Sequence, residues 1–338
     1  MSETSREIRL ASRPIGEPTP ANFSVADVPV GEPGPGQVLV RNAWLSVDPY
    51  MRARMNDAKS YVPPFQIGET LQGAAVGEVI TSNADQVPLG ATVLHFLGWR
   101  EYAIVDATAV RVLDTTIAPA QAYLGALGVV GLTAYAGLRR IAPVKEGDVV
   151  FVSGAAGAVG LITARVAKHF GAAKVIGSAG GPLKAKRLVE EFGYDAAIDY
   201  KADDLDGQLA LAAPDGIDVY FDNVGGDHLR AAINAMNRDG RIALCGAISA
   251  YNATTPPPGP ANLHQAIGKR LTLRGFVISD HQDLAAEYAH LAAAWLKDGS
   301  LRYEETVVDG IDNTAEAFLG MLKGANTGKM LIRLTTGT

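Results

Sequence analysis

Cysteine is nearly absent from this sequence, which contains one, Cys245, in 338 residues. A single cysteine excludes a disulfide within the chain and a structural zinc site with four cysteine ligands. The six histidines include no pair spaced for two metal ligands on one turn of a helix. We therefore expect no metal site.

The sequence also lacks an excess of positive charge, because 36 acidic residues outnumber 30 basic ones. Without a basic field or a run of basic residues, nucleic acid is not expected as a partner. One long uncharged segment, residues 115–138, contains Pro119, Gln121 and several glycines, so we interpret it as a buried helix rather than a membrane span. The polar N-terminal segment has no signal-peptide pattern, and we expect a cytoplasmic protein.

A chain of this length favours two domains. Residues 1 to about 115 contain short strand-like segments separated by Gly and Pro, which predict a small β-barrel-like domain. These segments are 38–47, 74–80, 91–99 and 101–106. From residue 148 the pattern alternates between strands and helices, which is typical of a doubly wound parallel sheet in an α/β protein.

The alternating region defines the following elements. We predict strands over 148–152, 174–178, 196–199, 217–226, 240–248 and 271–278, and helices over 182–192 and 283–296. A further helix should carry Leu229, Ile233 and Met236 on one face. Near the C-terminus, a helix over 314–323 and a strand over 328–334 are expected to return to the first domain.

The segment 148–160, DVVFVSGAAGAVG, is the most informative part of the chain. An apolar strand is followed by Gly154, Gly157 and Gly160 at every third position, and then by a helical pattern. Glycines allow the backbone to approach a ligand closely, and a helix N-terminus attracts anions. We therefore predict a pyrophosphate site. The spacing is GxxGxxG rather than GxGxxG, and a purely structural turn is the alternative.

The end of the second strand carries no acidic residue. Proteins that bind NAD usually place Asp or Glu there to accept hydrogen bonds from the ribose hydroxyls. In this chain residues 178–184 are SAGGPLK, in which small residues leave room for a phosphate and Lys184 supplies a positive charge. This arrangement favours NADP over NAD.

Seven motifs in both halves of the chain resemble those of a known family. They are VDPYMR at 47–52, GLTAY at 131–135, SGAAGAVG at 153–160, IDYK at 198–201, FDNVGG at 221–226, CGAISAYN at 245–252 and GKM at 328–330. Together they resemble the zinc-independent medium-chain dehydrogenase/reductases, in particular the prostaglandin reductases, plant alkenal double-bond reductases and bacterial curcumin reductases. The zinc-dependent relatives carry a His beside the acid that corresponds to Glu69, and this chain lacks it. The resemblance therefore implies no catalytic metal.

The resemblance also implies an architecture and a set of site residues. The expected domains are a GroES-like substrate domain, residues 1–124 and 300–338, and a Rossmann domain that binds NADPH, residues 125–299, in a homodimer. The cofactor residues carried over by motif are Thr133, Ala155, Ala156, Gly157, Ala158, Val159, Lys184, Tyr200, Asn223, Cys245, Gly246, Ala247, Ile248, Ser249, Phe276, Val277, Ile278 and Asn326. Tyr50 and Tyr251 are expected to flank the substrate.

The chemistry that fits this set is reduction of a carbon–carbon double bond conjugated to a carbonyl group. Hydride addition to the β-carbon of such an enone or enal produces an enolate, which needs hydrogen-bond donors rather than a metal. Tyr251 is the candidate donor, with a role in pocket shape alone as the alternative. We do not expect Cys245 to be a nucleophile. Two other functions stay open: an NADPH-dependent quinone reductase, and an NADPH-binding protein with little turnover. The loop 252–262 is either a semi-rigid lid or an exposed connection.

Overall fold

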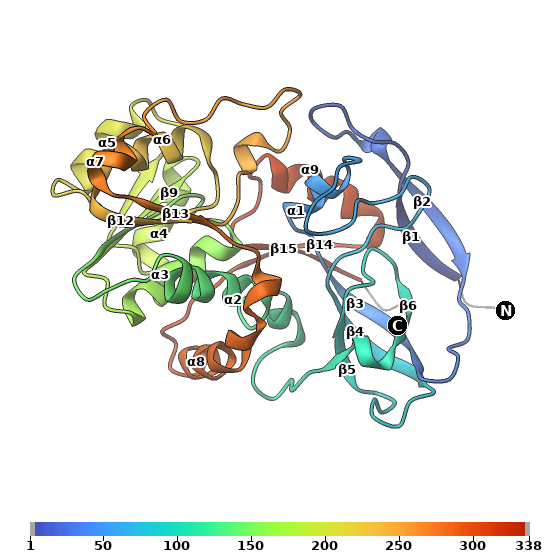
Figure 1. Ribbon diagram of the computed structural model, residues 1–338. Helices are drawn as coiled ribbons and strands as arrows, with labels where there is room; N and C mark the ends of the chain where they lie inside the picture. Colours follow the sequence, from blue (N-terminus) through green and yellow to red (C-terminus); the bar gives the residue numbers. More distant parts are fainter. Residues whose placement is uncertain (1–3, 335–338) are drawn as a thin grey trace. The chain divides into compact units, whose positions relative to one another are not determined.

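A six-stranded parallel sheet forms the centre of residues 126–304 (Figure 1). The computed structural model describes residues 4–334, and it separates into two units, Met1–Gly125 with Glu305–Thr338 and Ala126–Glu304. The strands of the parallel sheet are β8 (Val149–Val152), β9 (Lys174–Ala179), β10 (Ala196–Asp199), β11 (Ile217–Asp222), β12 (Met236–Leu244) and β13 (Thr272–Gly275). The helices of this unit are α2 (Val129–Ala136), α3 (Ala158–His169), α4 (Pro182–Glu191), α5 (Leu205–Ala212), α6 (Gly226–Ala235), α7 (Gln265–Lys269) and α8 (Ala285–Lys297).

The strand order of this sheet is β10-β9-β8-β11-β12-β13, with all neighbours parallel. The chain therefore runs outward from β8 in one direction and then outward from β11 in the other, which is the doubly wound order of dinucleotide-binding domains. Figure 1 shows α5 and α6 on one face of the sheet and α2 and α3 on the other. The α/β class with a doubly wound sheet is confirmed.

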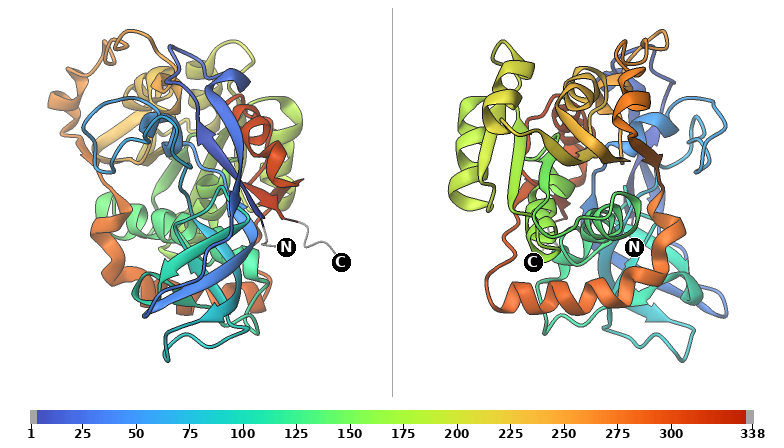
Figure 2. Two further views of the ribbon diagram at one scale, coloured as in Figure 1. Left: turned by 90° about the vertical axis from the view of Figure 1, so that its right-hand side faces the viewer. Right: turned by 60° about the vertical axis from the view of Figure 1, so that its left-hand side comes forward.

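Apolar side chains on both faces explain why these segments form buried strands. In β8, Val150, Phe151 and Val152 are completely buried, and the Phe151 ring stacks on Tyr220 of β11 with a centroid distance of 5.1 Å. The helices α5 and α6 complete this core with Leu209 and Ile233. On the opposite face α8 packs along α2, and the right-hand view of Figure 2 shows α8 in orange.

The other unit is built mainly from antiparallel strands. Its larger sheet has the order β14-β15-β3-β4-β5-β7, with β6 also paired to β3, and β1 and β2 form a separate antiparallel pair. Its elements are β1 (Thr4–Leu10), β2 (Phe23–Pro29), β3 (Gln37–Ser46), α1 (Tyr50–Arg54), β4 (Ala75–Ser82), β5 (Thr92–His95), β6 (Tyr102–Asp106), β7 (Arg111–Val112), β14 (Glu305–Asp309), α9 (Thr314–Leu322) and β15 (Lys329–Arg333). The C-terminal strand β15 thus lies beside β3.

The structure corrects several predicted boundaries. Met236 begins β12 with an extended backbone (φ −61°, ψ 136°), so it does not belong to the apolar face of α6, which ends one residue earlier. The strands predicted over 217–226, 240–248 and 271–278 end at Asp222, Leu244 and Gly275, because the chain turns away at the sheet edge after each of these residues. The uncharged segment 115–138 is not one helix: non-helical backbone at Gly125 and extended backbone at Gly128 divide it into a 3₁₀-helix (Ala120–Leu124) and α2.

Candidate functional site

The glycine-rich corner connects β8 to α3. Gly154 has a φ of +59°, in the left-handed region that favours glycine. The N–H of Ala155 donates to the Ser178 carbonyl at 2.8 Å, which fixes the corner to the end of β9. Gly157 is the N-cap residue of α3 and offers no side-chain cap. The first N–H groups of a helix have no acceptor within the helix, so this end of α3 can bind an anionic group.

Close packing at the corner depends on Gly160, in the first turn of α3. A Cβ atom at this position would lie 2.5 Å from the Ala155 Cα atom and 2.5 Å from the Gly154 carbonyl oxygen. Both distances are far below van der Waals contact, and both neighbours are backbone atoms. The helix can therefore approach the corner this closely only with glycine at 160.

The loop after β11 is organised by Asp222, which is 1% exposed. Its Oδ1 atom accepts hydrogen bonds from the Ser153 and Tyr220 hydroxyls, at 3.0 and 2.7 Å. The same oxygen accepts from the backbone N–H groups of Val224 and Gly225, at 2.9 and 2.8 Å. Four donors on one buried carboxylate oxygen hold the 223–226 turn in a single shape.

The side chain of Asn223 joins this turn to the glycine corner. Its Nδ2 atom donates to the Ser153 carbonyl at 2.8 Å, and its backbone N–H donates to the Ser153 hydroxyl at 3.0 Å. The turns after β8 and β11 therefore lie side by side, where the direction of the strand order changes. Ligands of doubly wound sheets bind outside this point.

The segment after β12 lies against the same turn. The backbone N–H groups of Cys245 and Gly246 donate to the Asp222 carbonyl at 2.9 and 3.0 Å. Ser249, in the 3₁₀-helix Ile248–Ala250, donates through its hydroxyl to the Val224 carbonyl at 2.6 Å. The predicted residues 155–159, Asn223 and 245–249 are thus brought together at one edge of the sheet.

Tyr251 follows this 3₁₀-helix directly. A Cβ atom at Gly246 would lie 3.6 Å from the Tyr251 hydroxyl oxygen. This hydroxyl is therefore close to the backbone just after β12. The Asn223 carbonyl oxygen lies 3.1 Å from the same Cβ position. The predicted donor is therefore close to the turn that follows β11.

The thiol of Cys245 is unsuited to nucleophilic chemistry. Burial, with a smaller contribution from the Asp222 carboxylate, raises the pKa of this thiol to about 12. The thiol thus remains protonated at neutral pH, and the thiolate is the reactive form of cysteine.

At the ends of β9 and β10, an aromatic and a basic side chain lie beside Gly180. A Cβ atom at Gly180 would lie 2.8 Å from the Tyr200 hydroxyl oxygen and 3.0 Å from the Lys201 Cε atom. The pKa of Lys184 is lowered by burial and by the positive charge of Lys201. Lys184 and Lys201 therefore face a common region, which fits the phosphate expected there.

Lys201 is a residue that the sequence analysis missed. It lies in the IDYK motif, and its position directly after Tyr200 at the end of β10 was the available signal. An acidic residue is also present at this corner, Asp199, but its Oδ1 atom accepts from the N–H groups of Gly181 and Lys201 at 2.7 and 3.0 Å. Its role is therefore to shape the turn. The Tyr200 ring packs edge-on against His228 with a centroid distance of 5.1 Å.

The remaining predicted residues lie on other elements. Thr133, in α2, donates its hydroxyl to the Val129 carbonyl at 2.7 Å. Phe276 follows β13, and its ring packs edge-on against Phe221 with a centroid distance of 6.4 Å. Val277 is the N-cap of a 3₁₀-helix that begins at Ile278. Tyr50 and Asn326 belong to the other unit, where Tyr50 begins α1 and Asn326 precedes β15. Burial and the Asp48 carboxylate raise the pKa of Tyr50 above its usual value, so its phenol stays protonated at neutral pH.

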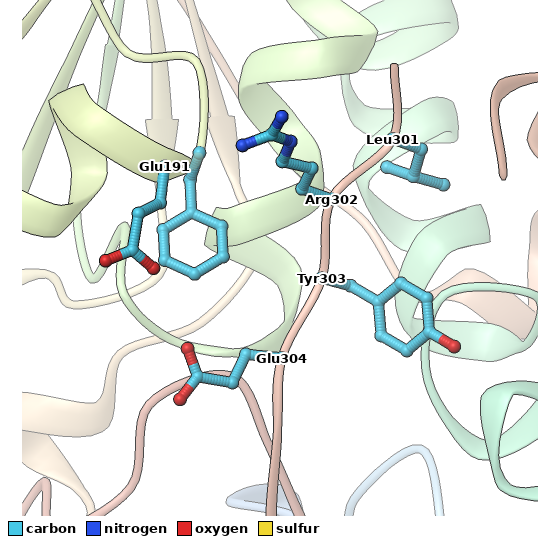
Figure 3. Close-up of a pocket in the computed structure, with 6 residues that line it drawn as sticks. Glu191, Leu301, Arg302, Tyr303 and Glu304 are labelled. Carbon is cyan, nitrogen blue, oxygen red and sulfur yellow. The ribbon is translucent and has the colours of Figure 1, made fainter. Parts of the chain in front are cut away.

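A pocket of about 340 Å³ is lined by none of the predicted cofactor residues (Figure 3). It is lined by Glu191, Phe192, Leu301, Arg302, Tyr303 and Glu304. The negative charge of Glu304 opposes the lowering of the Lys184 pKa, but Glu191 ends α4, about 10 Å along this helix from Lys184, and no residue of the glycine corner lines the pocket. We therefore do not assign this pocket to the cofactor.

Residues 4–334 contain no cluster of three or more His, Cys, Asp or Glu side chains that could hold a metal ion. Among the helices described, none is both long enough and apolar enough to cross a membrane.

Comparisons with known proteins agree over nearly the whole chain. Residues 6–113 match the N-terminal domain of oxidoreductase family, and residues 158–294 match the zinc-binding dehydrogenase family. The chain is 46% identical to the putative NADP-dependent oxidoreductase YfmJ of Bacillus subtilis, covering 99% of each. It is 41% identical to the NADPH-dependent curcumin reductase of Escherichia coli (98% of this chain, 97% of the relative). It is 36% identical to the NADP(+)-dependent 2-alkenal reductase of Nicotiana tabacum, covering 98% of each.

A solved structure supports the same relationship. CurA from Vibrio vulnificus, crystallised in complex with NADPH, superposes with a TM-score of 0.93 at 41% identity, covering 98% of this chain and all of the CurA chain. Similarity of this extent in sequence and fold identifies the family. The chain belongs to the medium-chain dehydrogenase/reductases, in the zinc-independent branch that includes the curcumin and 2-alkenal reductases.

Proposed function

We propose that this protein reduces the carbon–carbon double bond of α,β-unsaturated aldehydes and ketones. Membership of the branch makes the chain an NADP-dependent oxidoreductase that reduces activated double bonds with NADPH. The choice of enals and enones as substrates is the proposal. The observation that supports it best is the Tyr251 hydroxyl, which lies beside Gly246 at the sheet edge that carries the glycine corner.

The residues at this edge fit NADPH. Gly160 allows the N-terminus of α3 to approach the corner, and the uncapped N–H groups of that helix are suited to a pyrophosphate. Lys201 lies beside Gly180 and its charge acts on Lys184, so these two lysines supply the positive charge that a 2′-phosphate would need in this proposal. NADPH, when bound, supplies the hydride that reduces the double bond.

Tyr251 and Tyr50 act on the substrate in this proposal. As hydride adds to the β-carbon, negative charge develops on the carbonyl oxygen of the substrate. A phenol hydroxyl that donates a hydrogen bond to this oxygen stabilises the enolate more than the neutral ketone. We assign that donation to the Oη atom of Tyr251, with Tyr50 as the second side chain against the substrate. Both phenols are bulky and exclude water from the reacting carbons.

Replacing Tyr251 with Phe tests the donor. Loss of one donor to a developing oxyanion costs about 2 to 4 kcal/mol, so we expect kcat for an enone to fall about 30-fold or more. Tyr303→Phe is the matched control, because Tyr303 lies in the same unit at the pocket of Figure 3 and away from the glycine corner. A Tyr251→Phe enzyme with wild-type kcat would leave Tyr251 a role in shape alone.

Replacing Lys184 with Ala tests the phosphate site. A hydrogen bond to a charged group contributes about 1.5 to 3 kcal/mol, so KM for NADPH should rise about 10- to 100-fold. KM for NADH, which lacks the 2′-phosphate, should change little. Lys186→Ala is the control, since Lys186 is on the same helix with a side chain that is 67% exposed and paired to Glu190. Equal loss of NADPH and NADH activity in Lys184→Ala would contradict the assignment.

A panel of acceptors tests the substrate class. Purified protein is incubated with NADPH and a series of enals, enones and quinones, and the loss of absorbance at the reduced nicotinamide band is followed. Product analysis then distinguishes a saturated carbonyl compound from an alcohol or a hydroquinone. Turnover of quinones alone would replace the enone proposal with quinone reduction, and binding without turnover of any acceptor would make the chain a cofactor-binding protein. The homodimer and the cytoplasmic location stay predictions, and light scattering on purified protein tests the former.

A further inference from the structure

Two of the sequence motifs, VDPYMR and GKM, meet through one buried lysine. Lys329, the first residue of β15, is 3% exposed. Its Nζ atom donates to the Val47 carbonyl at 2.7 Å and to the Met330 carbonyl at 3.0 Å, and it forms an ion pair with the Asp48 Oδ1 atom at 3.1 Å. All three donor positions of the ammonium group are thus occupied.

The acceptors of Lys329 lie immediately before Tyr50 in the chain. Asp48 also accepts a hydrogen bond from the Ser46 hydroxyl at the end of β3, and its backbone carbonyl accepts from the Met51 N–H at 3.2 Å, in the first turn of α1. Pro49 then restricts the backbone between Asp48 and Tyr50. The direction in which Tyr50 leaves the sheet is therefore determined by Val47 and Asp48, the two residues that Lys329 holds.

A second carboxyl group, that of Glu305, is located beside Lys329, but Asp48 is the ion-pair partner. Glu305 of β14 is opposite Lys329 in the parallel register, and its Oε1 atom is buried without a hydrogen-bond partner. Burial raises the pKa of Glu305, while Gln121 and Lys329 oppose the rise. Of the two carboxyl groups near the ammonium, the one that precedes Tyr50 forms the ion pair.

The loop that contains Asn326 is held by hydrogen bonds that do not involve the Lys329 ammonium group. The Asn326 Nδ2 atom donates to the Gly328 carbonyl at 2.6 Å. The Thr306 hydroxyl donates to the Thr327 carbonyl at 2.8 Å and accepts from the Thr327 N–H at 3.1 Å. Removal of the Lys329 charge should therefore affect Tyr50 and leave the loop before β15 in place.

We infer that Lys329 is a positioning residue for the substrate, which acts by fixing the turn Val47–Asp48 and hence the Tyr50 side chain. This inference rests on the proposed role of Tyr50 at the substrate. It predicts a specific pattern: loss of Lys329 raises KM for the enone and leaves the dissociation constant for NADPH unchanged, because the phosphate and corner residues belong to the other unit.

The test compares Lys329→Met, Asp48→Asn and the double variant Lys329→Met/Asp48→Asn. Lys329→Met leaves the Asp48 carboxylate, whose side chain is 19% exposed, without its cation and should lower the unfolding temperature. The double variant removes both charges and should recover stability, but it still lacks the hydrogen bonds from Nζ to Val47 and Met330. We therefore expect KM for the enone to stay raised, about tenfold, in the double variant. Lys323→Met is the control, because Lys323 is 67% exposed and paired with Glu17 on the surface.

A second readout follows Tyr50 directly and does not depend on turnover. In protein labelled with 3-fluorotyrosine, the ¹⁹F resonance of Tyr50 is assigned by its loss in Tyr50→Phe. We expect this resonance to move in the double variant and to stay in place in Lys323→Met. A double variant with the wild-type resonance and the wild-type KM would overturn the inference. If wild-type protein reduced no acceptor, the proposed function would fail, and the ¹⁹F shift alone would decide: a moved resonance supports the role of Lys329 and an unmoved one refutes it.

Discussion

Replacing Gly160 with Ala should separate α3 from the glycine corner. The added Cβ atom would lie 2.5 Å from the Ala155 Cα atom, about 1 Å closer than an ordinary carbon–carbon contact. Two carbonyl oxygens, of Gly154 and Ala155, would lie at 2.5 and 2.6 Å. Since all three neighbours are backbone atoms, no side chain can rotate away, and the helix must move by about 1 Å.

The magnitude of the effect follows from this displacement. Overpacking of this kind costs about 1 to 3 kcal/mol of the free energy of unfolding. The same movement withdraws the N–H groups of α3 from the position of a pyrophosphate. We therefore expect the dissociation constant for NADPH to rise at least about tenfold, which corresponds to about 1.4 kcal/mol.

Thermal unfolding by circular dichroism and titration of nicotinamide fluorescence measure the two effects. Gly268→Ala is the matched control, because Gly268 is also in a helix, α7, and its Cβ atom would have no neighbour within 4 Å. Alanine there should be neutral or stabilise the protein by up to about 1 kcal/mol. If Gly160→Ala lowered stability but bound NADPH with the wild-type dissociation constant, the corner would not be the phosphate site.

Three further predictions concern buried ionisable groups. Burial lowers the pKa of His95 to about 4, whereas an unfolded histidine titrates near 6.5, so the free energy of unfolding should decrease as the pH falls from about 6.5 to 4. Thermal melts of His95→Gln should show a smaller decrease. Asp222→Ala leaves four hydrogen-bond donors without their acceptor and should cost about 3 kcal/mol in denaturant unfolding, together with weaker NADPH binding. Because the Cys245 thiol has a pKa of about 12, iodoacetamide should alkylate it more than about a hundredfold more slowly in folded protein than in urea, as measured by mass spectrometry.

The sequence was sufficient for the parallel sheet because its strands are short apolar runs with clear ends. The strand predicted over 174–178 and β9 differ by one residue, and the strand predicted over 196–199 coincides with β10. The prediction failed where no loop separates two elements. Met236 continues the apolar spacing of α6, but the backbone becomes extended at that residue. The β1–β2 pair was missed because five of the seven residues of β1, TSREIRL, are polar, and the strand is stabilised by pairing with residues 23–29.

For the candidate site, too, the sequence predicted local features but not contacts between distant segments. Motifs near one strand, such as the corner at 153–160, could be placed from sequence because each strand end lies at a predictable edge. The hydrogen bond from Ser153 to Asp222 and the ion pair of Lys329 with Asp48 could not, because they join residues 69 and 281 positions apart in this 338-residue chain. Lys201 was missed for a related reason, since its proximity to Gly180 depends on how two strand ends meet.

Asp222 and Asp48 show that the family motifs contain two kinds of residue. Some are proposed to contact a ligand, and others hold the backbone beside them in place. Each aspartate is followed within two residues by a residue proposed to touch a ligand, Asn223 or Tyr50, and each is itself occupied by internal partners. A buried carboxylate is costly unless it is paired, so such a residue stabilises one local backbone shape strongly over others. Replacing these aspartates by apolar residues should therefore change ligand affinity even in variants whose stability is restored elsewhere. Restoring the unfolding temperature of Asp222→Ala with distant stabilising substitutions, and finding the NADPH affinity restored as well, would refute it.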